Sequence, residues 1–225
     1  MPRLFLLMLL LPLGAFAQIW AGFSGGYSFT TVNPPEKFGF EQSSSVDSTK
    51  GQDFAISFTS DLTQKIRLTG RMTYNRGSMY VFHRYIEVQG LENQIDGKLD
   101  HQYLGIYLAP MWHKGEDLEF IYGLGFYTGF KMSGIFSGVY RTLTDRETDI
   151  VKVNRAPADN FNNMATGLYT SVGLNLNISP KIQANLNADV VLFLNAKNII
   201  FQDTGSVNEI NLRLGVSYLF EKRED

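Results

Sequence analysis

The sequence predicts an all-β fold, a single eight-stranded, antiparallel, up-and-down transmembrane β-barrel. Three observations support this prediction. Eight segments alternate between apolar residues and polar or small residues, which is the period of a strand with one apolar face. Short turns and long polar connections separate the segments in alternation, as in barrels that cross a membrane. Charged residues in these segments fall almost entirely on the polar face.

The first 17 residues are predicted to be a signal peptide. Arg3 is followed by the apolar run from Leu4 to Leu11, and Ala15-Phe16-Ala17 forms a small-x-small cleavage site before Gln18. The apolar run is too short to cross about 30 Å of hydrocarbon as a helix. We therefore expect an exported protein whose residues 18–225 form one barrel domain.

The composition excludes several classes of function. The net charge of −2 favours no nucleic-acid partner. The absence of cysteine rules out disulfides, thiolate metal sites and a thiol nucleophile. We expect no cofactor and no bound metal.

Eight strands are predicted from the alternation, and each reaches the length that crosses a bilayer when tilted. They are residues 19–30, 52–61, 66–75, 102–112, 118–132, 165–178, 182–194 and 209–220. Residues 62–65, 113–117 and 179–181 are predicted as tight turns. Residues 31–51, 133–163 and 195–206 are predicted as long loops, and residues 76–100 as an extended loop that could continue the strands beyond a membrane.

A soluble, lipocalin-like barrel would also have eight strands, but its apolar face would point inward. The charged face carries only a small set of charges, namely Arg67, Arg71, Glu119, Lys131, Asp189 and Arg213. So few charges cannot form the surface of a soluble domain. Aromatic residues also gather near the strand ends, as in interfacial girdles. At the turn end these are Trp112, Phe120, Tyr218 and Phe220.

The strand–turn–strand unit carries a family resemblance. It runs from Tyr103-Leu104-Gly105-Ile106-Tyr107-Leu108-Ala109-Pro110 to Phe120-Ile121-Tyr122-Gly123-Leu124-Gly125-Phe126-Tyr127. With the signal peptide and the aromatic end of the last strand, it resembles the PorT-like outer-membrane β-barrel family of Gram-negative bacteria and, more loosely, OmpA-type barrels. The resemblance implies a place in the cell outer membrane, contact with outer-membrane lipid and insertion by the barrel-assembly machinery.

Three inward charges are predicted to lie near the middle of the barrel: Arg71, Asp189 and Arg213. The seventh and eighth strands are neighbours, so Asp189 and Arg213 are expected to pair. Two interpretations stay open. The charges could form an ionic gate, or a packed polar core in which buried charges neutralise one another.

An enzymatic alternative rests on the histidines. Some eight-stranded outer-membrane proteins modify lipid A with a histidine and a serine or acid near the membrane surface. His83 and His101 flank the second long connection, with Ser78 and Glu87 nearby, but their spacing matches no triad or metal signature. We expect these histidines to lie exposed in loops. Gly123, Gly125 and Gly129 are expected to face inward and make room for bulky neighbours such as Tyr103, Tyr107 and Tyr169.

The sequence thus predicts a non-enzymatic outer-membrane barrel that binds through its surface loops or assists an envelope assembly, where an envelope protein is the possible partner. A lipid-modifying enzyme and a narrow transporter of a small or apolar solute are the alternatives.

Overall fold

The computed structural model describes residues 18–33, 43–47, 49–86, 92–143, 148–157, 164–194 and 206–221. The predicted signal peptide lies outside these residues. Ten strands form: β1 (Gln18–Asn33), β2 (Ser43–Asp47), β3 (Thr49–Thr63), β4 (Ile66–Ile86), β5 (Glu92–Lys114), β6 (Leu118–Leu143), β7 (Thr148–Pro157), β8 (Met164–Ser179), β9 (Ile182–Phe193) and β10 (Ser206–Glu221). Among the described residues, no helix is long and apolar enough to span a membrane.

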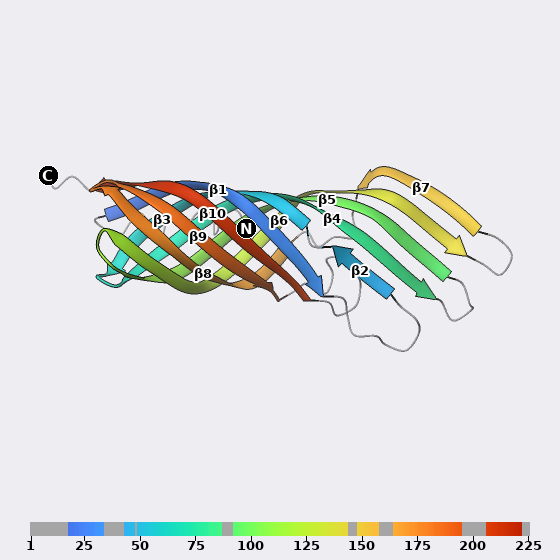
Figure 1. The fold of residues 1–225 in the computed structure, drawn as a ribbon, viewed down its shortest axis with the longest axis horizontal. Coiled ribbons are helices and arrows are strands. Elements are labelled where there is room, and N and C mark those ends of the chain that lie inside the picture. The colour runs from blue at the N-terminus through green and yellow to red at the C-terminus, as the bar shows by residue number, and fades with distance from the viewer. Residues whose placement is uncertain are drawn as a thin grey trace.

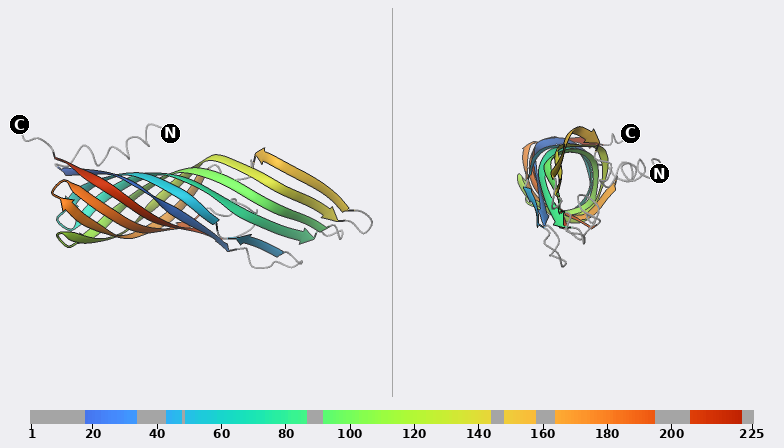
Figure 2. Two further views of the ribbon diagram at one scale, coloured as in Figure 1. Left: turned by 45° about the horizontal axis from the view of Figure 1, so that its top comes forward. Right: turned by 90° about the vertical axis from the view of Figure 1, so that its right-hand side faces the viewer.

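Eight of the strands close into a barrel (Figures 1 and 2). The order around it is β1, β3, β4, β5, β6, β8, β9, β10, and β1 pairs with β10 to complete the ring. All pairs are antiparallel. Closure leaves the barrel itself without an unpaired edge, which a lipid environment requires. The predicted fold class is confirmed.

When paired residues are followed from strand to strand around the barrel, the path returns to β1 ten residues away from its start. The paired residues, starting from Thr31 on β1, are Asn208, Leu192, Leu168, Phe126, Leu108, Gly70, Phe58 and Ala21, which is again on β1. This stagger requires the strands to tilt from the barrel axis by roughly 40°, and the tilt is visible in Figure 1.

The two faces of the sheet differ in chemistry as predicted. Large apolar side chains point outward and stay exposed, with Phe126 at 69% and Leu214 at 68%. Buried polar and charged side chains, such as Arg71 and Asp189, point inward. This inside-out distribution is that of a barrel with a lipid-facing exterior.

Three strands continue beyond the barrel and form an extension (Figure 1). β4, β5 and β6 stay paired as far as Ile86, Glu92 and Leu143. β2 pairs with this part of β4, and β7 pairs with this part of β6. Residues 133–143 and 148–157 are therefore strands, and their prediction as a polar loop is wrong. Residues 43–47 and 49–51 likewise form strand within the predicted loop 31–51.

The outward face of the extension carries charged side chains. The side chains of Lys98 and Asp100 are 54% and 53% exposed and form an ion pair of 3.1 Å between Nζ and Oδ1. Arg84 donates from Nε and Nη2 to Glu92 at 2.5 and 2.7 Å. Exposed charges of this kind belong in water and distinguish the extension from the exterior of the barrel.

The Arg84–Glu92 pair gives a first prediction. The hydrogen bonds from Arg84 lower the pKa of Glu92 from its ordinary value of 4.5. Arg84→Gln should return that pKa to about the ordinary value, as measured by NMR titration of the side-chain carboxyl carbon. Because the folded-state pKa is lowered, the pair stabilises the extension above the unfolded-state pKa, and this is lost as the pH falls through the folded-state pKa. An unchanged pKa in the variant would refute the assignment.

Candidate functional site

An ionic chain crosses the middle of the barrel interior. Arg71 of β4 donates from Nη1 to Oδ2 of Asp189 on β9 at 2.5 Å, and Arg213 of β10 donates to the same oxygen. Nε of Arg213 also donates to Asp53 of β3. All four side chains are at most 5% exposed. The structure thus brings together the three predicted residues and adds Asp53, so that two arginines face two carboxylates.

Asp53 joins the chain because β1 carries glycine between the two charges. Gly26 is the register partner of Arg213 on one side and of Asp53 on the other. With no side chain at this inward position, the guanidinium of Arg213 reaches across β1. The sequence signal for this contact is a glycine that lies between opposite charges on the two flanking strands. It can be recognised only when the register of the three strands is known.

A second ionic group lies nearer the short turns. Arg67 donates from Nη1 and Nη2 to the carboxylate of Glu119 at 2.5 and 3.0 Å, and from Nε to Asp61 at 2.7 Å. Asn175 adds a 3.4 Å hydrogen bond to Glu119. Such bidentate pairing is the arrangement in which an arginine and a carboxylate compensate each other best.

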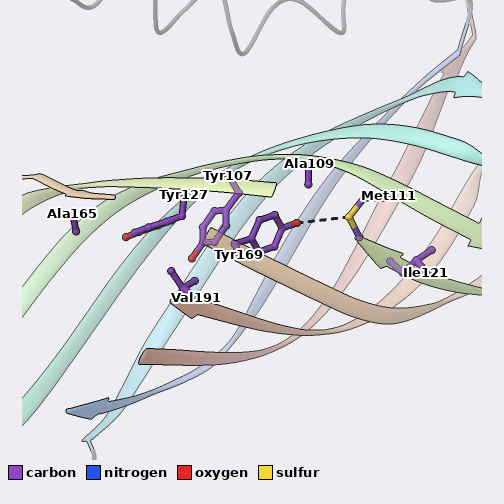
Figure 3. Packing of buried hydrophobic residues seen from close by; sticks show 8 residues of the cluster. All are labelled: Tyr107, Ala109, Met111, Ile121, Tyr127, Ala165, Tyr169 and Val191. Atoms are coloured by element: carbon purple, nitrogen blue, oxygen red, sulfur yellow. Dashed lines mark hydrogen bonds between the residues drawn. The ribbon is translucent and has the colours of Figure 1, made fainter. Parts of the chain in front are cut away.

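Three tyrosine rings, those of Tyr107, Tyr127 and Tyr169, lie together in the barrel interior (Figure 3). The ring centroid of Tyr107 lies 4.7 Å from that of Tyr127 and 4.9 Å from that of Tyr169. The guanidinium carbon of Arg213 lies 5.5 Å from the centre of the Tyr107 ring, within the range of a cation–π contact. Rings and ion pairs together fill the central cross-section.

The inward glycines make room for bulky neighbours, but the side chains that a Cβ would meet first are not the three tyrosines named as examples. A Cβ at Gly129 would overlap the hydroxyl oxygen of Tyr127, and one at Gly105 would lie 2.7 Å from the Tyr127 ring. A Cβ at Gly123 would overlap Sδ of Met111, and one at Gly125 would overlap the backbone of Leu108. The glycines therefore accommodate Tyr127, Met111 and the backbone of β5.

A cavity of about 50 Å³, lined by both polar and apolar side chains, lies between the two ionic groups. Its lining includes Arg67, Arg71, Asn187 and Ser24, with Met111 on the apolar side. This volume holds a few water molecules. Together with the filled centre it describes a packed polar interior, as eight strands allow.

Glu209 lies on the loop side of the ionic chain and is 8% exposed. Nδ2 of Asn75 donates to its Oε1 at 2.8 Å. Among the described residues, no arginine or lysine forms an ion pair with it. Sequence reasoning missed Glu209, because it lies at the edge of the predicted last strand, where its facing was not assigned.

The enzymatic alternative finds no assembled site among the described residues. His101 is 7% exposed and lies inside β5, so the expectation of an exposed loop histidine is wrong for this residue. Ser78 instead donates to Asp100 at 2.5 Å. Glu87 and the side chain of His83 lie outside the described residues. No three His, Cys, Asp or Glu side chains of the described part gather as they would around a metal ion.

The predicted interfacial aromatics point outward at the turn end. The exposed fractions of Trp112, Phe120, Tyr218 and Phe220 range from 37% to 56%. Trp112 stacks on Tyr122 at 5.7 Å between ring centroids, and Tyr218 contacts Phe220 edge-on at 4.9 Å. Their role at a membrane interface stays a prediction.

Comparison with solved structures places the fold among small outer-membrane barrels. The outer membrane protein OprG of Pseudomonas aeruginosa is 13% identical, with a TM-score of 0.50 and coverage of 93% of this chain and 99% of that one. Neisserial surface protein A is 14% identical (TM-score 0.47, coverage 90% and 97%), as is the attachment invasion locus protein Ail of Yersinia pestis (TM-score 0.42, coverage 90% and 99%). The sequence matches no family model and no curated protein. These likenesses concern the fold alone.

Proposed function

We propose that this protein is a non-enzymatic barrel of the bacterial outer membrane that works by binding through the extension it holds outside the membrane. One observation carries the proposal. The barrel interior is filled at mid-height by the ionic chain and the tyrosine rings, whereas β4, β5 and β6 continue well past the barrel rim. The fold shared with OprG supports the outer-membrane location.

The binding role takes one of two forms. The extension binds a partner at the cell surface, or it serves an assembly of the envelope, as the PorT-like resemblance implies. In either form the rigid barrel is the anchor, and the strands and loops beyond it make the contact.

The orientation can be tested with single cysteines, because the chain has none of its own. Lys98→Cys lies on the extension and Lys181→Cys lies in the β8–β9 turn, and both positions are exposed. A membrane-impermeant maleimide should label Lys98→Cys on intact cells and Lys181→Cys only after lysis. The opposite pattern, or labelling of neither on intact cells, would contradict the proposal.

The binding role is tested by shortening the extension. A variant in which residues 79–98 and 136–157 are each replaced by a short turn should still close its barrel, because the described residues of these two ranges pair within the extension. Affinity purification from gently solubilised membranes should recover a partner with the full chain and not with the shortened one. Equal recovery from both would place the binding surface elsewhere.

The filled interior predicts that the barrel does not conduct ions. Purified protein in planar lipid bilayers should give no recurrent unit conductance above that of detergent alone. Mid-barrel side chains leave no room for a hydrated ion in a barrel of eight strands. A reproducible conductance step that depends on protein concentration would favour the transporter alternative.

A further inference from the structure

The barrel is a closed ring of paired strands, but the extension ends in an edge strand, β7 (Figure 1). One side of β7 pairs with β6, and no other strand in the described part of the chain pairs with its second side. In an antiparallel pair, the N–H and C=O groups of alternate residues point to one neighbour and those of the residues between them point the other way. Every second residue of β7 therefore directs its backbone groups to a side where no described strand receives them.

Side chains on both faces of β7 are exposed along this edge. Asp149, Ile150, Val151 and Lys152 are all exposed, Ile150 at 56% and Val151 at 58%. Because successive residues of a strand point to opposite faces, neither face of this stretch is covered. Exposed β-branched residues on a free edge favour the addition of a further strand.

Natural sheets usually protect a free edge, and β7 carries such protection mainly at the end nearer the barrel. The pairing with β6 is irregular near Arg155, whose φ is 55°. Pro157 follows and has no N–H to donate. A bulge and a proline both discourage a further strand. From residue 148 to residue 153 the register with β6 is continuous, and neither device interrupts the edge.

We propose that the free edge of β7, residues 148–153, binds an extended segment of a partner protein, which adds to the extension as a further strand. The proposal rests on the binding role proposed above and names the surface that makes the contact. The spacing of N–H and C=O groups along a strand edge is matched by another polypeptide strand, whereas a glycan or a lipid does not match it.

The charges on β7 specify the chemistry of this segment. Opposite charges that face each other across two strands attract, and like charges repel. The segment therefore carries an acidic residue opposite Lys152 and a basic residue opposite Asp149. Between these two it carries apolar residues, which face Ile150 and Val151.

A peptide that contains the run Thr-Glu-Val-Val-Lys-Thr complements residues 148–153 in antiparallel register and serves as the probe. Its binding to the refolded full chain in detergent is measured by fluorescence anisotropy. N-methylation of the alternate amides that face β7 should weaken binding by roughly tenfold or more, because each methyl group removes a backbone hydrogen bond. N-methylation of the intervening amides should weaken it far less. Equal effects of the two patterns, or no binding at millimolar peptide, would overturn the proposal.

Two charge variants locate the bound peptide. Lys152→Glu should weaken binding several-fold, and a peptide with lysine in place of its glutamate should restore it. Lys98→Glu is the matched control, since Lys98 is exposed on β5, away from the edge, and should bind the peptide as the unaltered chain does. Equal binding by both variants would place the peptide elsewhere. A dimer of the chain that the peptide dissociates would assign the edge to a second copy and also overturn the proposal.

Competition separates this proposal from the binding role on which it rests. Excess peptide should displace the partner that the full chain recovers from solubilised membranes. A partner that stays bound would refute the edge and leave the binding role standing. Recovery of no partner by the full chain would contradict the binding role itself.

Discussion

Replacing Asp189 by alanine is expected to lower the free energy of unfolding of the barrel by about 3–5 kcal/mol. The carboxylate of Asp189 accepts hydrogen bonds from both Arg71 and Arg213, and its side chain is fully buried. Without it, Arg71 loses its ion-pair partner and Arg213 keeps only Asp53. The guanidinium group of Arg71 is then left in the barrel interior without an ion-pair partner.

Thermal or denaturant unfolding in detergent measures this effect. Asp117→Ala is a suitable control, since Asp117 is an exposed acid in the β5–β6 turn, and it should change the unfolding free energy by less than about 0.5 kcal/mol. Adding Arg71→Met to Asp189→Ala removes the guanidinium group that has lost its ion-pair partner, so this double variant should regain part of the lost stability. An unfolding transition equal to that of the unaltered protein would show that Asp189 does not hold the chain together.

Gly26→Ala is expected to destabilise the barrel by roughly 3 kcal/mol, at the upper end of the usual range for overpacking. A Cβ at this position would overlap the backbone carbonyl oxygen of Leu212 on the neighbouring β10. Backbone cannot move aside as a flexible side chain can. The added methyl group would also stand between Arg213 and Asp53, which pair across Gly26.

Gly70→Ala provides the matched control for this substitution. A Cβ at Gly70 would meet nothing within 4 Å. This variant should fold like the unaltered protein. The yield of heat-modifiable, folded barrel and the midpoint of unfolding report both variants. Equal folded yields and equal unfolding midpoints of the two glycine variants would mean that the paired backbones of β1 and β10 can move apart to accept a side chain.

The barrel itself could be predicted because lipid and packed interior impose opposite chemistry on alternate residues. The run from Ile210 to Phe220 shows this pattern, and its outward residues are exposed in the structure. The extension carries the opposite signal. Between Gln94 and Asp100 the residues still alternate, but the exposed face is polar and the buried face carries Ile95 and Leu99. Its outer face meets water, so the apolar outward face that marks a membrane strand is missing.

The candidate site was predictable only in part for a related reason. Alternation identifies which residues point inward but not how neighbouring strands align. Arg71, Asp189 and Arg213 could be placed by counting residues from the short turns. The contact of Arg213 with Asp53, and the approach of Glu209 to Asn75, depend on the ten-residue stagger around the barrel, which emerges only from the paired register.

The bond between Arg213 and Asp53 joins residues 160 positions apart, across the strand with which the barrel begins. It can form only when the last strand has docked on the first, because Arg213 reaches Asp53 across β1. Interactions that are absent from the folding transition state slow unfolding without speeding folding. We therefore expect the ion pair to slow the unfolding of the closed barrel and so to extend its lifetime.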